Sequence, residues 1–180
     1  MKHTIRILCL IMAFVSIQSF AAGPETGPVI NNYGPVFAVP EGSYSLVPGK
    51  QYKVLMDIGK GPDDPSEINR SIESAARFLN MSSRNGIKAE NLKLALVLHG
   101  SAAQAALNAE AHSERFLEPG GSQQLIEELG KAGFDIYICG QTAAYRGFTA
   151  EELLPEVTMA VSAMTVHVRL QQEGYQAILF

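Results

Sequence analysis

The chain has 180 residues, a length that accommodates one ordinary domain and a leader. It carries 14 basic and 18 acidic residues, a net charge of −4 with neutral histidines. This acidic balance argues against sequence-independent binding to nucleic acid or to an anionic membrane surface, because both depend on basic patches.

Residues 1–21 have the pattern of a cleavable secretory signal. A short basic start is followed by an apolar run over residues 7–17 and by small residues around Ala21. The apolar run is too short to span a bilayer as a stable helix, and no later apolar stretch is long enough. We therefore expect cleavage after Ala21, a periplasmic or secreted location and no stable membrane insertion; an uncleaved anchor is the alternative.

The number of cysteines limits the possible roles of the thiol in the mature chain. Cys9 would leave with the leader, so Cys139 is the one thiol of the mature chain and has no internal disulfide partner. A leftover cysteine in an exported protein is buried and inert, paired between chains, or used chemically.

Residues 22–50 form an arm that is rich in glycine and proline. This composition excludes a helix and leaves few runs for a central strand. Apolar residues within the arm, including Val36, Phe37 and Val47, indicate that it packs against the domain or against a neighbouring subunit.

From residue 51 onward, strand-like and helix-like segments alternate. Strands are expected over residues 52–58, 92–98, 134–139, 154–160 and 175–179. Helices are expected from Asp64 to about Asn85 and over residues 102–107, 123–132, 140–146 and 162–173, with a polar and mobile segment over residues 108–122. The first helix is predicted to start at Asp64 because an N-cap aspartate is followed by Pro65 and Glu67.

This alternation predicts a three-layer α/β/α domain over residues 51–180. Strands separated by helices favour a mostly parallel, five-stranded sheet with helices on both faces, of the flavodoxin or Rossmann-like kind.

Three chemically useful residues fall at the carboxyl ends of expected strands, where open parallel sheets bind ligands: Asp57, His99 and Cys139. Cys139 also begins a short helix, whose N-terminal amides favour a thiolate. Arg146 follows on that helix and would favour a bound anion or a charged sulfur. The candidate catalytic residues are therefore Cys139, His99 and Arg146.

Each candidate has a structural alternative. Cys139 is also consistent with a small buried hydrophobic residue, and His99 with a hydrogen-bonded turn histidine. Arg146 is also consistent with a surface ion pair to Glu151 or Glu152.

Other polar residues are interpreted structurally. Asp57 reads as a turn residue, and His112 and His167 as surface or interface residues. Three histidines and one cysteine in the mature chain argue against a structural zinc site. Residues 59–61 complete neither a phosphate loop nor a dinucleotide pattern, so no cofactor is expected.

The segment around Cys139 resembles that of a known family. Residues 138–147 (ICGQTAAYRG) are similar to the cysteine segment of DsrE/DsrF-like proteins, in which a strand delivers a cysteine, small residues follow and Arg-Gly closes a short helix. The resemblance extends over about residues 51–180 and includes Leu98-His99-Gly100, the segment 151–155 (EELLP) and the segment 170–175 (LQQEGY).

The resemblance implies a parallel α/β domain that assembles into trimers, hexamers or hetero-oligomers. It also implies a persulfide on the matching cysteine, Cys139. The export signal, the arm and the pair Gly140-Gln141, in place of a more apolar pair, depart from the family's sulfur carriers. These departures leave the partner and the substrate open.

The leading hypothesis is an exported sulfur carrier or sulfurtransferase. A Cys139 thiolate would accept sulfane sulfur as a persulfide and pass it to a partner thiol or anion, with His99 assisting proton transfer and Arg146 stabilising the sulfur. The expected partners are further copies of the chain and a sulfur-donating or sulfur-accepting protein. The alternative is a non-catalytic small-ligand-binding or oligomeric scaffold of the same fold. A cysteine hydrolase using Cys139 and His99 has less support, because no orienting third residue or oxyanion motif is visible.

Overall fold

A five-stranded parallel sheet forms the centre of the molecule. The computed structural model describes residues 23–180, so the expected leader, with Cys9 and the cleavage site, lies outside the described residues. The strand order is β4-β3-β2-β1-β5, and every neighbouring pair is parallel. The strands are β1 (Tyr52–Ile58), β2 (Leu92–Leu98), β3 (Phe134–Cys139), β4 (Val157–Ala160) and β5 (Gln176–Leu179). The predicted parallel sheet is confirmed.

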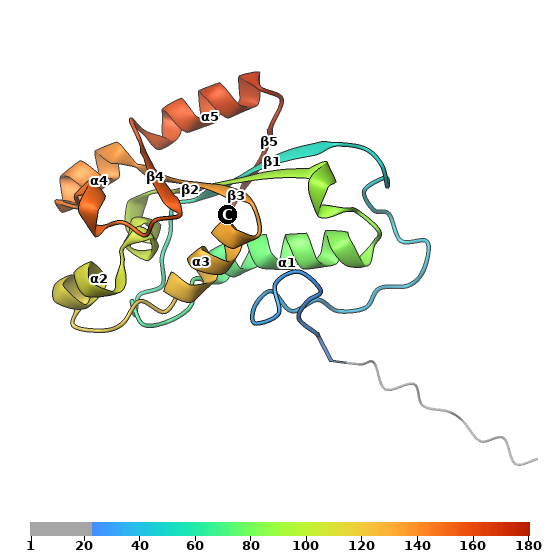
Figure 1. Ribbon diagram of the computed structural model, residues 1–180, viewed down its shortest axis with the longest axis horizontal. Helices are drawn as coiled ribbons and strands as arrows, with labels where there is room; N and C mark the ends of the chain where they lie inside the picture. The colour runs from blue at the N-terminus through green and yellow to red at the C-terminus, as the bar shows by residue number, and fades with distance from the viewer. Residues whose placement is uncertain (1–22) are drawn as a thin grey trace, which may run out of the picture.

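Helices lie on both faces of this sheet, as the alternating sequence predicted. The α-helices are α1 (Arg70–Arg84), α2 (Ala109–Phe116), α3 (Gln123–Lys131), α4 (Gly140–Arg146) and α5 (Ala163–Gln172). Short 3₁₀ helices span Ala89–Asn91, Gly100–Ala106 and Ala150–Glu152. Figure 1 shows α1 and α3 on one side of the sheet and α5 on the other. Within residues 23–180, no helix combines the length and the apolar character needed to cross a membrane.

The two faces of the sheet are covered unequally. Met56, Leu96 and Ile138 belong to a large buried cluster with α1 and α3. The opposite face has a smaller cluster, in which Leu55 and Val97 pack with residues of α5. Burial of the central strands on both faces explains why β2 reads as an almost continuous apolar run.

The strand register places the candidate residues together. Leu98 of β2 lies opposite Ile58 of β1 and Ile138 of β3. Since side chains alternate along a strand, the residues next to these three in the chain share the other face of the sheet, which α5 covers. Asp57, His99 and Cys139 are therefore directed to the α5 face at one edge of the sheet.

Helix α1 begins later than the sequence predicted. Its N-cap is Asn69, whose side chain accepts hydrogen bonds from the backbone N–H groups of Ser71 and Ile72. Asp64 is a turn residue instead, since its carboxylate accepts from the N–H and the hydroxyl of Ser66. The Asp64 start was therefore wrong, because this local turn satisfies the Asp64 side chain before any helix begins.

The segment over residues 108–122 is not the mobile connection that was expected. It contains α2, which Asn108 caps by accepting from the N–H of Ala111. His112 is 2% exposed, and its Nδ1 lies 2.8 Å from the carbonyl oxygen of Glu118. His112 was interpreted as a surface or interface residue; it is not on the surface of the domain, because its ring packs against Phe116 and contacts the loop that follows α2.

The Gly/Pro-rich arm packs on α1 of its own chain. Asn80 is fully buried, and its side-chain oxygen accepts from the N–H groups of Val29 and Ile30. Its amide donates to the carbonyl oxygens of Ile30, Tyr33 and Gly34. Of the two alternatives for the arm, the structure shows packing against the domain.

Candidate functional site

A cavity of about 520 Å³ opens to solvent at the carboxyl ends of β1, β2 and β3, beside the start of α5. Its titratable lining residues are Asp57, His99, Cys139 and His167. The other residues that line it are Gln141, Thr142, Ser162, Ala163, Met164 and Val168. The cavity therefore joins two of the three predicted catalytic residues, Cys139 and His99, with two that were interpreted differently.

Cys139 ends β3 and is the N-cap residue of α4. It is 7% exposed. Burial raises the pKa of its thiol, but hydrogen bonds from the backbone N–H groups of Ala163, Thr142 and Gln141, together with the Thr142 hydroxyl, outweigh burial and lower that pKa below its ordinary value. The sulfur thus faces amides from the first turns of both α4 and α5, where the helix dipoles also favour negative charge.

Gly140 allows α4 to start so close to the sheet. A Cβ atom at this position would overlap the carbonyl oxygen of Ala160, at the end of β4. A side chain on Gly140 would therefore push the first turn of α4, and the amides that face Cys139, away from β4.

Asp57 lies between two imidazole rings. Its Oδ1 is buried and lies 3.0 Å from Nε2 of His99 and 3.4 Å from Nε2 of His167. Both contacts have ion-pair distances, yet no group among the described residues is aligned to hydrogen-bond with that oxygen. The interpretation of Asp57 as a turn residue was wrong, because its side chain points into the cavity from within β1.

His99 rests on a glycine. A Cβ atom at Gly59 would lie 2.6 Å from Cε1 of the His99 ring, so only a glycine leaves the ring its present position. The contact with Gly59 and the contact with Asp57 together fix where this imidazole lies.

His167 was interpreted as a surface or interface residue, but its side chain lines the cavity. It lies on the inner side of α5, and Nε2 of Gln171 lies 3.2 Å from its Nδ1. The sequence did contain a signal: Ala163, Val166, His167 and Leu170 follow the spacing of a single helix face, which packs on the sheet.

Arg146, the third predicted residue, does not line the Cys139 cavity. It lies in an adjoining groove of about 350 Å³ that shares Gln141 and Thr142 with that cavity. Arg146 forms no ion pair with Glu151 or Glu152 among the described residues, and the Glu152 carboxylate instead accepts from Arg115 at 2.6 Å.

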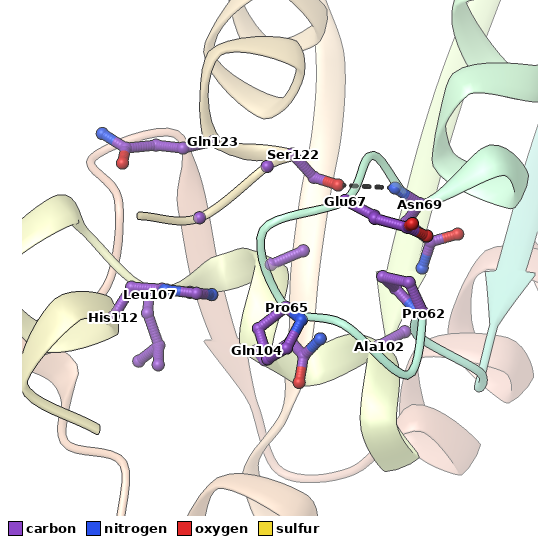
Figure 2. A pocket seen from close by; sticks show the side chains of 13 residues that line it. Pro62, Pro65, Glu67, Asn69, Ala102, Gln104, Leu107, His112, Ser122 and Gln123 are labelled. Carbon is purple, nitrogen blue, oxygen red and sulfur yellow. Dashed lines mark hydrogen bonds between the residues drawn. The ribbon is translucent and has the colours of Figure 1, made fainter. Parts of the chain in front are cut away.

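A second, enclosed cavity lies away from these residues. Figure 2 shows it between the loop that precedes α1 and the start of α3, where the Ser122 hydroxyl accepts from the N–H of Asn69 at 2.8 Å. Its volume of about 10 Å³ is enough for one water molecule and too small for a substrate. Over residues 23–180, no group of three or more His, Cys, Asp or Glu side chains is arranged to hold a metal ion.

Comparisons with known proteins agree with this architecture. A model of the DsrE/DsrF-like family matches residues 53–180. A protein of unknown function, MTH1491 from Methanobacterium thermoautotrophicum, is similar in structure, with 22% identity, a TM-score of 0.55, and coverage of 72% of this chain and 100% of that one. The ychN protein from E. coli is similar with 19% identity, a TM-score of 0.52 and the same coverage. No curated protein matches this chain.

Proposed function

This chain belongs to the DsrE/DsrF-like family, and from that premise we propose that it is an exported sulfur carrier or sulfurtransferase that holds sulfane sulfur as a persulfide on Cys139. Residues 1–21 would direct the chain out of the cytoplasm and be removed. The loaded sulfur would then pass to a partner thiol or to a small anion.

The observation that carries this proposal is the environment of the Cys139 sulfur. Amides from the first turns of α4 and α5 and the Thr142 hydroxyl converge on it and lower the pKa of the thiol. The same donors suit a persulfide anion, which places its charge one sulfur atom further into the cavity.

The transfer step balances without an external oxidant. The Cys139 thiolate attacks the terminal sulfur of a sulfane-sulfur anion, and a new bond joins Sγ to that sulfur. The S–S bond of the donor breaks, and its electron pair leaves with the remainder: sulfite from thiosulfate, or a polysulfide shortened by one atom. His99 assists with the thiol proton, and Arg146 in the adjoining groove attracts the anionic donor.

Intact mass of the purified mature protein tests the proposal. After brief exposure to polysulfide, we expect the wild type to gain sulfur that a reductant removes, and Cys139→Ser to gain none while keeping the wild-type circular dichroism spectrum. Loading that persists in Cys139→Ser would contradict the proposal. Absence of loading in the wild type, with an unreactive Cys139, would favour the non-catalytic scaffold instead.

A further inference from the structure

We propose that Asp57 and His167 are positioning residues that hold His99 ready to take the thiol proton of Cys139. This inference deepens the proposed function and assigns roles to two residues outside the Cys139, His99 and Arg146 set.

The sheet places the Cys139 thiol and the His99 imidazole at the carboxyl ends of neighbouring strands. His99 follows β2 and Cys139 ends β3, and each comes directly after the last paired residues of the two strands, Leu98 and Ile138. Neighbouring strands lie about 4.8 Å apart, so side chains at adjacent positions on one face of the sheet are close neighbours. The Thr142 hydroxyl also links the two segments, since it accepts from the N–H of Gly100 at 3.3 Å and hydrogen-bonds to the Cys139 sulfur.

Asp57 lies on β1 opposite Val97, two residues before His99, and its side chain is directed to the same face of the sheet. Its Oδ1 lies 3.0 Å from Nε2 of His99, and Gly59 leaves room for the ring at that distance. An imidazole that accepts a proton becomes a cation, and a carboxylate at this distance stabilises the cation and fixes the ring. Strand register therefore supplies the orienting carboxylate that the sequence did not reveal.

His167 completes the arrangement from α5. Nε2 of Gln171, one turn along the same helix, lies 3.2 Å from Nδ1 of His167 and contacts the ring on that side. Nε2 of His167 lies 3.4 Å from Oδ1 of Asp57, an ion-pair distance without the alignment of a hydrogen bond. His167 thus places a second imidazole nitrogen beside the carboxylate oxygen that contacts His99.

The proton balance is simple. His99 accepts the proton of the Cys139 thiol, the resulting thiolate forms the new S–S bond, and the imidazolium later returns the proton to solvent. The titratable side chains that face His99 across the cavity are Asp57 from β1, Cys139 from β3 and His167 from α5.

The test measures Cys139 alkylation by iodoacetamide across pH, which reports the thiol proton without any sulfur chemistry, alongside persulfide loading from thiosulfate. We expect Asp57→Asn and His99→Ala each to move the midpoint of alkylation to higher pH and to slow loading at least about tenfold. Because Asp57 acts through His99, the double variant should be no slower than His99→Ala alone. Asp57→Glu should recover part of the loss.

Two further variants distinguish an effect of the His99 ring position from a general effect on folding. Gly59→Ala keeps every titratable group but displaces the ring, so we expect it to reproduce the His99→Ala profile. Asp135→Asn removes an exposed carboxylate from the other end of the same sheet face and serves as the matched control with a wild-type profile.

Independent effects would overturn the inference: a double variant slower by the product of the two single effects, or an Asp57→Asn profile identical to the wild type. A wild type that gains no sulfur from any donor would refute the proposed function, and the alkylation cycle would still decide the roles of Asp57 and His99.

Discussion

At the scale of single residues, Thr142 is the side chain that most directly tunes Cys139. Its hydroxyl lowers the pKa of the thiol, and the thiolate is present above that pKa. We expect Thr142→Val, which keeps the shape and removes the donor, to raise the pKa and to reduce alkylation at neutral pH about three- to tenfold. The pH dependence of the iodoacetamide rate measures this shift.

Thr158→Val on the exposed side of β4 is the control, since it removes a hydroxyl of the same kind away from the cavity. An unchanged midpoint in Thr142→Val would show that the backbone amides alone set the reactivity of Cys139.

The sequence predicted two of the four titratable residues of the cavity, Cys139 and His99, and it did not predict the roles of Asp57 and His167. Strand ends are short-range features, so Cys139 and His99 could be assigned from apolar runs and the residues that stop them. The role of Asp57 depends on which strands are neighbours and in what register, and this is decided by long-range pairing. His167 needed the orientation of α5 on the sheet as well, although its spacing on the helix was readable.

At the scale of elements, one buried amide joins the arm to α1. Replacing Asn80 by alanine would leave the N–H groups of Val29 and Ile30 and the carbonyl oxygens of Tyr33 and Gly34 without their partner. We expect Asn80→Ala to lower the free energy of unfolding by about 2 to 4 kcal/mol, measured by urea denaturation.

Asn32→Ala removes an exposed hydrogen bond to Glu128 from the same arm, and we expect a change within about 0.5 kcal/mol. Equal effects of the two substitutions would mean that the arm contributes no buried hydrogen bonding in solution.

The start of α1 shows where local rules stop being sufficient. Asp64 and Asn69 both have a side chain suited to an N-cap, and the local signals around Asp64 were the stronger ones. Asn69 caps the helix in the structure because its backbone N–H also meets the hydroxyl of Ser122, from a segment far along the chain. The strand boundaries could be predicted without such a distant contact, since three of the five strands match their predicted ranges.

At the scale of the whole molecule, the uneven covering of the sheet leaves apolar side chains exposed on one side. One face is covered by α1 and α3, and α5 is the main element on the other. Large apolar side chains on that side stay exposed, with Met164 at 74%, Val168 at 60% and Leu179 at 71%. Association removes exposed apolar side chains of this kind from water, and we propose that this face joins copies of the chain into a trimer or hexamer.

Light scattering coupled to size exclusion tests this assembly. We expect the wild type to run as an oligomer and the double variant Met164→Glu and Val168→Glu to run as a monomer with an unchanged circular dichroism spectrum. Val39→Glu alters an exposed apolar residue of the arm, outside this face, and should leave the oligomer intact. Since Met164 and Val168 also line the Cys139 cavity, assembly through this face would narrow its opening. A monomeric wild type would instead leave this face free for the sulfur-donating or sulfur-accepting protein.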